Sequence, residues 1–195
     1  DRVIRLGEMY LERGDLERAT RQADRAIQAN RPSASAWALR GNVLRALDRN
    51  QESLAAYHRA LSYQGHYPDV QLAIAEIYRS QGRHSRELAT LRTLADAYPP
   101  GETPTHVLYQ QGLALKQLRR YQAAADVLAA AAERSGPSSE ILYHLAESQW
   151  LAGDAANARL TVRSALDRSQ SNPADRRVAT ELLSLQRRLS QTPRL

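Results

Sequence analysis

The stretch that decides the fold is residues 37–61, WALRGNVLRALDRNQESLAAYHRAL. Its apolar side chains recur at helical spacing in two runs, one beginning at Trp37 and the other at Leu54, which favours two amphipathic helices. Between the runs lie Asp48, Arg49 and Asn50, and Asp and Asn favour a tight turn that caps the next helix. The stretch therefore predicts a helix–turn–helix hairpin.

The same hairpin recurs along the chain. Gly7 and Gly41 lie 34 residues apart, and so do Ala26 and Ala60. One step is longer, because Ala75 and Gly112 are 37 residues apart and the run PPGETP at 99–104 forms a loop within that step. The spacing predicts five repeat units at about 1–32, 33–67, 68–103, 104–137 and 138–171, followed by a capping helix at 173–190.

Two rows of small residues run through the repeats, where helices that cross closely leave no room for a large side chain. The rows are Gly7, Gly41, Ala75, Gly112, Ala146 and Ala26, Ala60, Ala131, Ala165. The third unit departs from them, with Glu87 and Leu94 at positions that are small elsewhere. This departure predicts altered packing between the third and fourth units.

The last predicted helix is expected to cover the open apolar face of the fifth unit, as the end of a solenoid requires. Its apolar stripe is Val178, Leu182, Leu185 and Leu189. Asn172 and Pro173 favour a helix start at 173.

These units resemble the tetratricopeptide repeat (TPR) family. The second unit carries the match most fully, with Trp37, Gly41, Leu44, Tyr57 and Ala60 in the family's positions. The resemblance covers roughly residues 1–170 and implies one all-α domain over 1–195, a right-handed α-solenoid with a concave groove. It also implies that the groove holds a peptide or a partner protein.

The row of small residues that begins at Gly7 marks the side of each first helix that packs on its neighbours. We expect the residue directly after each member of this row to point toward the groove, together with the residues one helical turn before and after it. The rows give a basic line, a broken acidic line and an aromatic end. The ligand-groove residues we predict are Glu8, Asn42, Arg45, Glu76, Arg79, Tyr109, Lys116, Tyr143, Glu147 and Trp150.

Two interpretations of these residues stay open. Glu76 and Arg79 have the spacing of an ordinary surface ion pair. Alternatively the rows form a ligand platform, since arginine binds carboxylates bidentately and aromatic side chains anchor many interfaces. Trp150 has the same two interpretations, because the capping helix could cover it instead.

Composition excludes most chemistries. Cysteine is absent, which removes thiolate nucleophiles and cysteine-ligated metal sites. No Gly-rich phosphate loop, nucleophile elbow or zinc-protease motif is present. The histidines are interpreted as scattered and solvated, with a binding contact left open for His106 and His144; they are His58, His66, His84, His106 and His144. We expect no enzyme activity, cofactor or metal.

The formal net charge of +6 is unevenly distributed. Residues from Arg159 onward carry 8 basic and 3 acidic side chains, which gives +5, and the first 158 carry 19 and 18, which gives +1. Binding of nucleic acid needs a contiguous basic surface, so the nearly neutral body disfavours it.

The sequence thus predicts a non-enzymatic scaffold or adaptor that binds a peptide or protein segment. The first alternative is self-association, as an assembly module within a larger repeat protein. The second is binding of an anionic partner, nucleic acid or membrane, through the Arg-rich C-terminal helix. No apolar run approaches the roughly 20 residues of a membrane span. We expect a soluble bacterial protein, with the cytoplasm and the periplasmic side of the envelope both open.

Overall fold

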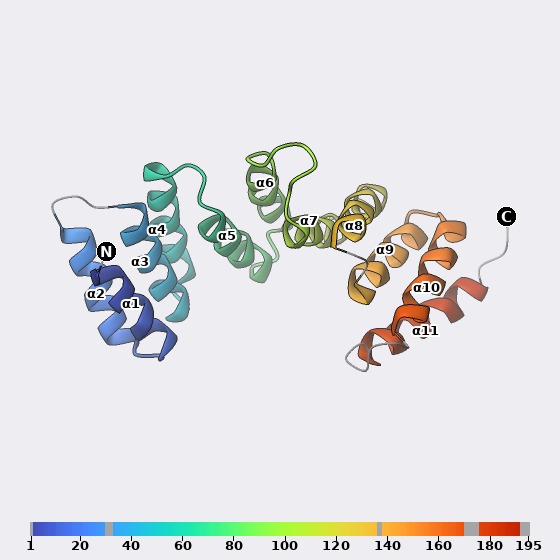
Figure 1. The fold of residues 1–195 in the computed structure, drawn as a ribbon, viewed down its shortest axis with the longest axis horizontal. Coiled ribbons are helices and arrows are strands. Elements are labelled where there is room, and N and C mark those ends of the chain that lie inside the picture. Colours follow the sequence, from blue (N-terminus) through green and yellow to red (C-terminus); the bar gives the residue numbers. More distant parts are fainter. Residues whose placement is uncertain (1, 30–32, 136–137, 170–175, 192–195) are drawn as a thin grey trace. The chain divides into compact units, whose positions relative to one another are not determined.

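The computed structural model describes residues 2–29, 33–135, 138–169 and 176–191, and over these ranges it is helical without strands (Figure 1). The helices are α1 Arg2–Glu12, α2 Leu16–Gln28, α3 Ala34–Ala46, α4 Asn50–Tyr63, α5 Pro68–Ser80, α6 His84–Ala95, α7 Thr105–Gln117, α8 Tyr121–Ser135, α9 Ser139–Leu151, α10 Ala155–Ser169 and α11 Arg176–Gln191. The predicted all-α class is confirmed. Among the described residues, no helix combines the length and apolarity that crossing a membrane requires.

The chain divides into two compact units, residues 1–83 and residues 84–195. In unit 1 each helix packs on the next, from α1 to α5, and in unit 2 the same holds from α6 to α11. The division falls inside the third predicted repeat, one helix earlier than the interface that Glu87 and Leu94 mark in the sequence. Both residues are buried within unit 2. One continuous domain over 1–195 stays a prediction.

The turn between the two helices of a repeat has one left-handed residue, at the same position each time. It is glycine in three turns, Gly14, Gly82 and Gly153, with φ between 67° and 93°. In the other two turns it is Asp48 (φ 57°) and Arg119 (φ 58°). Glycine adopts this backbone without steric cost, whereas an arginine there is strained.

Acidic side chains then cap two of the following helices. Asp15 accepts a hydrogen bond from the backbone N–H of Arg18 at 3.0 Å, and Asp154 accepts one from that of Asn157 at 3.1 Å. Each satisfies a donor that the first turn of a helix leaves free. The predicted tight turns are confirmed, and so are the caps at Asp15 and Asp154. The cap predicted for residues 48–50 is wrong, because Asp48 takes the left-handed turn position and Arg49, which directly precedes α4, makes no side-chain capping hydrogen bond.

The small rows mark close helix crossings, as predicted. A Cβ added to Gly41 would lie 2.4 Å from ring carbons of Tyr57, and one added to Gly112 would lie 2.5 Å from Leu128 Cγ. Ala75 and Ala146 are buried at the same row. The long loop that precedes α7 is also present, and Arg134 donates a hydrogen bond to its Thr103 carbonyl.

Helix α11 covers the end of unit 2. Leu182, Leu185 and Leu189 are buried in the core that α8, α9 and α10 form. The capping role is therefore confirmed over 176–191, while the predicted start at Asn172 and Pro173 lies outside the described residues.

Candidate functional site

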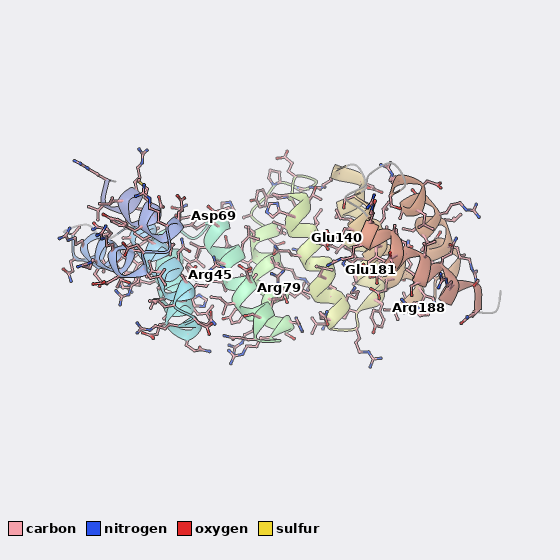
Figure 2. The ribbon with its side chains drawn as sticks, turned by 90° about the horizontal axis from the view of Figure 1, so that it is seen from below. Arg45, Asp69, Arg79, Glu140, Glu181 and Arg188 are labelled. Atoms are coloured by element: carbon pink, nitrogen blue, oxygen red, sulfur yellow. The ribbon has the colours of Figure 1, made fainter. Side chains whose placement is uncertain are left out.

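A cluster of three charges lies on the first helices of unit 1. Arg45 stands in the last turn of α3, and its Nη1 donates a hydrogen bond of 2.7 Å to Glu76 Oε2 on α5. Arg79 Nη2 lies 3.5 Å from the other oxygen of the same carboxylate. Two guanidinium groups thus share one carboxylate, and the cluster, which we call the unit-1 cluster, keeps one positive charge on an exposed surface (Arg45 and Arg79 are labelled in Figure 2).

Asn42 lies one turn before Arg45 and is fixed by the core beneath it. The buried Tyr57 hydroxyl donates a hydrogen bond of 2.6 Å to Asn42 Oδ1. Burial raises the pKa of Tyr57, so its hydroxyl remains a proton donor. The hydrogen bond from Tyr57 therefore fixes the orientation of the Asn42 side-chain amide, which lies beside the unit-1 cluster. Glu8 is exposed on α1 and makes none of these contacts.

A second cluster joins α7 and α9 in unit 2. Lys116 Nζ lies 2.6 Å from Glu147 Oε2 and 2.9 Å from His144 Nδ1. The Lys116 ammonium, which only donates hydrogen bonds, is therefore within hydrogen-bonding distance of both side chains. The three side chains, which we call the unit-2 cluster, are each no more than 20% exposed.

The unit-2 cluster strongly favours an ionised Glu147. The neighbouring His144 and the hydrogen bond and charge of Lys116 lower the pKa of Glu147 to about 2, against burial, which raises it. The carboxylate and the ammonium are thus a fixed pair, and Lys116 is not a free cation.

Two tyrosines stand around His144. The ring centroid of Tyr109 on α7 lies 5.8 Å from that of His144, and that of Tyr143 on α9 lies 5.0 Å from it. Burial, together with the charges of Glu147 and Glu181, raises the pKa of Tyr143. The structure thus brings two predicted groove aromatics, Tyr109 and Tyr143, onto the unit-2 cluster.

Trp150 belongs instead with the capping helix. Its ring packs on the core of unit 2, and the Arg188 guanidinium of α11 lies 5.1 Å from the ring centroid (Arg188 is labelled in Figure 2). A cation over a tryptophan ring stabilises the contact between the two helices. Of the two interpretations of Trp150, the structure favours covering by α11.

The two clusters repeat one geometry. Arg45 pairs with Glu76 and Lys116 with Glu147, and in both pairs the partners are 31 residues apart on successive first helices. The basic and acidic lines that the sequence suggests as separate features are thus bonded to each other at these two places. Glu76 keeps its predicted surface pair with Arg79 as well.

The interpretation of all histidines as solvated is wrong for two of them. His144 is part of the unit-2 cluster, and His84 Nδ1 lies 2.9 Å from the buried Glu87 carboxylate. His58, His66 and His106 are exposed as predicted. The missed signal is a glutamate three residues after each of the two, on the same helix face. Across the described ranges, no group of three acidic or histidine side chains could hold a metal.

Several arginines near the C-terminus make contacts within the protein. Arg159 donates a hydrogen bond of 3.0 Å to the Leu189 carbonyl, and Arg177 lies 3.7 Å from Glu181. With Arg188 over Trp150, three of these residues make internal contacts. These contacts hold three guanidinium groups in place but leave the net charge of +5 unchanged, because Glu181 is already counted in it.

A family model for the tetratricopeptide repeat matches residues 4–61, 38–102 and 109–173. The chain belongs to the tetratricopeptide repeat family. TPR proteins are generally protein-interaction scaffolds, and this chain is one in that general sense. No curated protein matches the sequence of this TPR protein.

Solved structures with the same fold include other TPR proteins. One from Parabacteroides merdae ATCC 43184 has a TM-score of 0.78 at 19% identity, covering 97% of this chain and 75% of its own. YrrB, a TPR protein with an unusual peptide-binding site, has a TM-score of 0.76 at 18% identity, covering 93% and 90%. MamA from Desulfovibrio magneticus RS-1 has a TM-score of 0.74 at 15% identity, covering 88% and 95%.

Proposed function

We propose that this TPR protein is a non-enzymatic scaffold that binds peptide or protein segments on two first-helix faces, one in each unit, which carry the unit-1 cluster and the unit-2 cluster. The observation that carries the proposal is the arrangement of unit 2. Lys116 and Glu147 are held in a fixed pair beside the half-buried rings of Tyr109 and Tyr143. Preorganised polar groups next to aromatic anchors are the usual make-up of an interface hot spot.

The chemistry of each cluster indicates what a segment bound there presents. Arg45 and Arg79 keep one positive charge around Glu76, which suits an aspartate, a glutamate or a terminal carboxylate. Tyr109 and Tyr143 suit an apolar or aromatic side chain. YrrB, which has this fold and a peptide-binding site, supports the same general role.

The test is selection from a peptide-display library, followed by affinity measurement on the enriched peptides. We expect the peptides that bind unit 1 to share an acidic residue and those that bind unit 2 to share an apolar or aromatic one. The variant Arg45→Glu/Arg79→Glu/Tyr109→Ala/Tyr143→Ala should lose at least tenfold in affinity while keeping its helical circular dichroism.

A matched control changes two exposed arginines and an exposed tyrosine outside the clusters, as Arg21→Glu/Arg92→Glu/Tyr63→Ala. It should bind as the parent protein does. Equal affinity of the parent and the cluster variant would place binding elsewhere and would contradict the proposal.

A further inference from the structure

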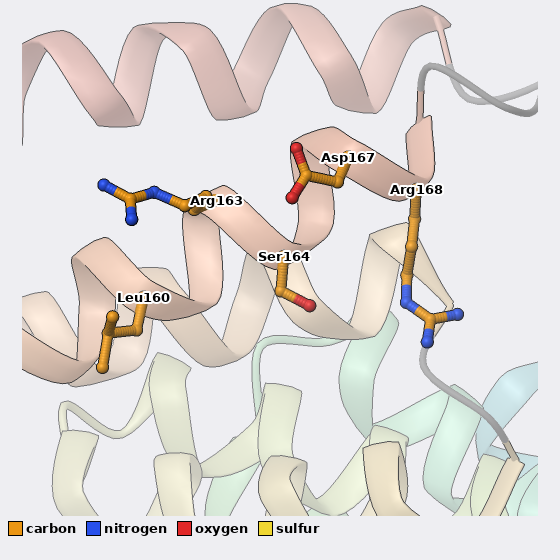
Figure 3. Close-up of a pocket in the computed structure, with 5 residues that line it drawn as sticks. All are labelled: Leu160, Arg163, Ser164, Asp167 and Arg168. Atoms are coloured by element: carbon orange, nitrogen blue, oxygen red, sulfur yellow. The ribbon is translucent and has the colours of Figure 1, made fainter.

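One large apolar side chain of unit 2 is mostly exposed to solvent. Leu160 on α10 is 63% exposed, the highest value among the large apolar side chains in the described ranges. With Arg163, Ser164, Asp167 and Arg168 it lines an open hollow of about 580 Å³ along the helix (Figure 3). This strip of α10 therefore presents a leucine followed by charged residues at one-turn spacing.

A second hollow lies in unit 1, on the side of α3 and α4. Its volume is about 350 Å³, and its apolar lining is Trp37, Leu44, Ala55 and Ala56. The two alanines leave room for a side chain that arrives from outside. The rim is charged, with Arg40, Glu52 and Arg59.

The charges beside this hollow continue to Arg49, the residue directly before α4. Arg49 donates to both oxygens of Glu52, with bonds of 2.7 and 2.6 Å, and both side chains are more than half exposed. From Ala56 toward the N-terminus of the helix, the surface therefore presents a small residue, then the acidic Glu52, then the basic Arg49.

The α10 strip has the complementary order of charges over the same total length. Ala56, Glu52 and Arg49 are separated by four and three residues, while Leu160, Arg163 and Asp167 are separated by three and four. Both sets span two helical turns. Laid antiparallel, the helices place Leu160 at Ala56, Arg163 at Glu52 and Asp167 at Arg49. A parallel arrangement would bring Arg163 toward Arg59 instead, where like charges repel.

We propose that the α10 strip of one molecule docks into the α3–α4 hollow of a second copy of this chain. Leu160 enters the hollow, and Arg163 and Asp167 extend the Arg49–Glu52 pair into a four-charge network. The two surfaces differ, so the contact is heterologous, and every bound copy still offers one free strip and one free hollow. This self-assembly is independent of peptide binding at the unit-1 and unit-2 clusters.

Sedimentation equilibrium of the intact chain, from micromolar to millimolar concentration, tests the proposal. We expect concentration-dependent association that Leu160→Glu weakens at least tenfold. The control is Leu183→Glu, which changes the same residue type at a 45% exposed position on α11 and should associate as the parent does. A parent protein that stays monomeric throughout, or equal weakening by both variants, would overturn the proposal.

A mixing experiment distinguishes this contact from a symmetric one. Leu160→Glu removes the strip but leaves the hollow, and Ala55→Arg fills the hollow from an exposed position but leaves the strip. Each variant alone should be monomeric, and an equimolar mixture should form one-to-one dimers. A mixture that stays monomeric while the parent associates would refute the heterologous contact.

Charge reversal tests the register. Arg163→Glu alone and Glu52→Arg alone should each weaken association, because each places like charges opposite one another. The double variant should recover most of the loss. Circular dichroism identifies any variant that has unfolded. If the double variant associates no better than the singles, the antiparallel register is wrong.

Discussion

Lys116 on α7 and Glu147 on α9 form an ion pair of 2.6 Å that joins the first helices of two successive repeats. Arg45 and Glu76 form the same kind of pair in unit 1, over the same separation of 31 residues. The unit-2 pair is the more enclosed, with side chains at most 20% exposed, whereas those of the unit-1 pair are at least 43% exposed. Stability should therefore depend more on the pair in unit 2.

Replacing Glu147 by glutamine should destabilise unit 2 by about 1–3 kcal/mol at pH 7, because the variant leaves the Lys116 ammonium partly buried without its carboxylate. The pKa of Glu147 is about 2 in the folded protein, below its ordinary value of 4.5. Its contribution is therefore complete above about pH 4.5 and is lost as the pH falls toward 2. Urea unfolding at pH 7 and pH 3 should show the difference between parent and variant shrinking at low pH.

The control for that experiment is Glu52→Gln, which breaks the exposed pair with Arg49. Exposed pairs contribute little, so this variant should unfold like the parent at pH 7. A difference between Glu147→Gln and the parent that stays the same at pH 3 would contradict the role assigned to the ionised carboxylate.

Arg119→Gly should stabilise the protein by about 0.5–1 kcal/mol, because it relieves a left-handed backbone that costs arginine more than glycine. Asp48→Gly should gain less, since Asp tolerates this conformation and its carboxylate accepts a hydrogen bond from the Asn50 side chain. Gly153→Ala should lose stability although nothing lies within 4 Å of its added Cβ. Thermal unfolding of the three variants checks this order, and an unchanged or lower melting temperature for Arg119→Gly would contradict it.

Gly41→Ala should cost about 1–3 kcal/mol, because the new methyl group would overlap the Tyr57 ring. Gly65 is the matched control, since its Cβ would meet nothing within 4 Å and its backbone is not left-handed. Gly65→Ala should therefore be neutral or slightly stabilising. Chemical unfolding of both variants measures the contrast, and similar losses in the two would rule out the steric explanation.

Leu185→Ala should cost about 2–5 kcal/mol, because it opens a cavity between α11 and the rest of unit 2. Leu183→Ala, at an exposed position on the same helix, should change stability by less than about 0.5 kcal/mol. The two tryptophans lie one in each unit, so in a Trp37→Phe background the fluorescence of Trp150 reports on unit 2 alone. Equal stability of the two leucine variants would show that α11 does not cap the core.

Much of the fold could be predicted from local patterns in the sequence. The small residues that recur every 34 positions, Gly7 and Gly41 among them, predicted the hairpins because close helix crossings require them. The stripe of Leu182, Leu185 and Leu189 predicted the capping helix, because a solenoid must cover its end. The left-handed turn at Arg119 could not be predicted by residue type, and only its alignment with Gly153 points to it.

The contacts of the candidate site could be predicted less well, because they depend on how helices face each other. The bond between Arg45 and Glu76 crosses between helices and follows from no spacing within one helix. His144 looked isolated because its partner Lys116 is 28 residues away.

Because Arg45 already bonds the carboxylate of Glu76, a partner's carboxylate binds Arg45 by replacing that of Glu76. Glu76 meanwhile stays beside Arg79, so the number of ion pairs is conserved and only the single surplus positive charge of the cluster is neutralised. Added salt weakens the bond that is lost and the bond that is formed to a similar degree. Affinity at this surface should accordingly vary only gently with ionic strength, and partners will be distinguished by the fit of their carboxylates more than by how many negative charges they carry.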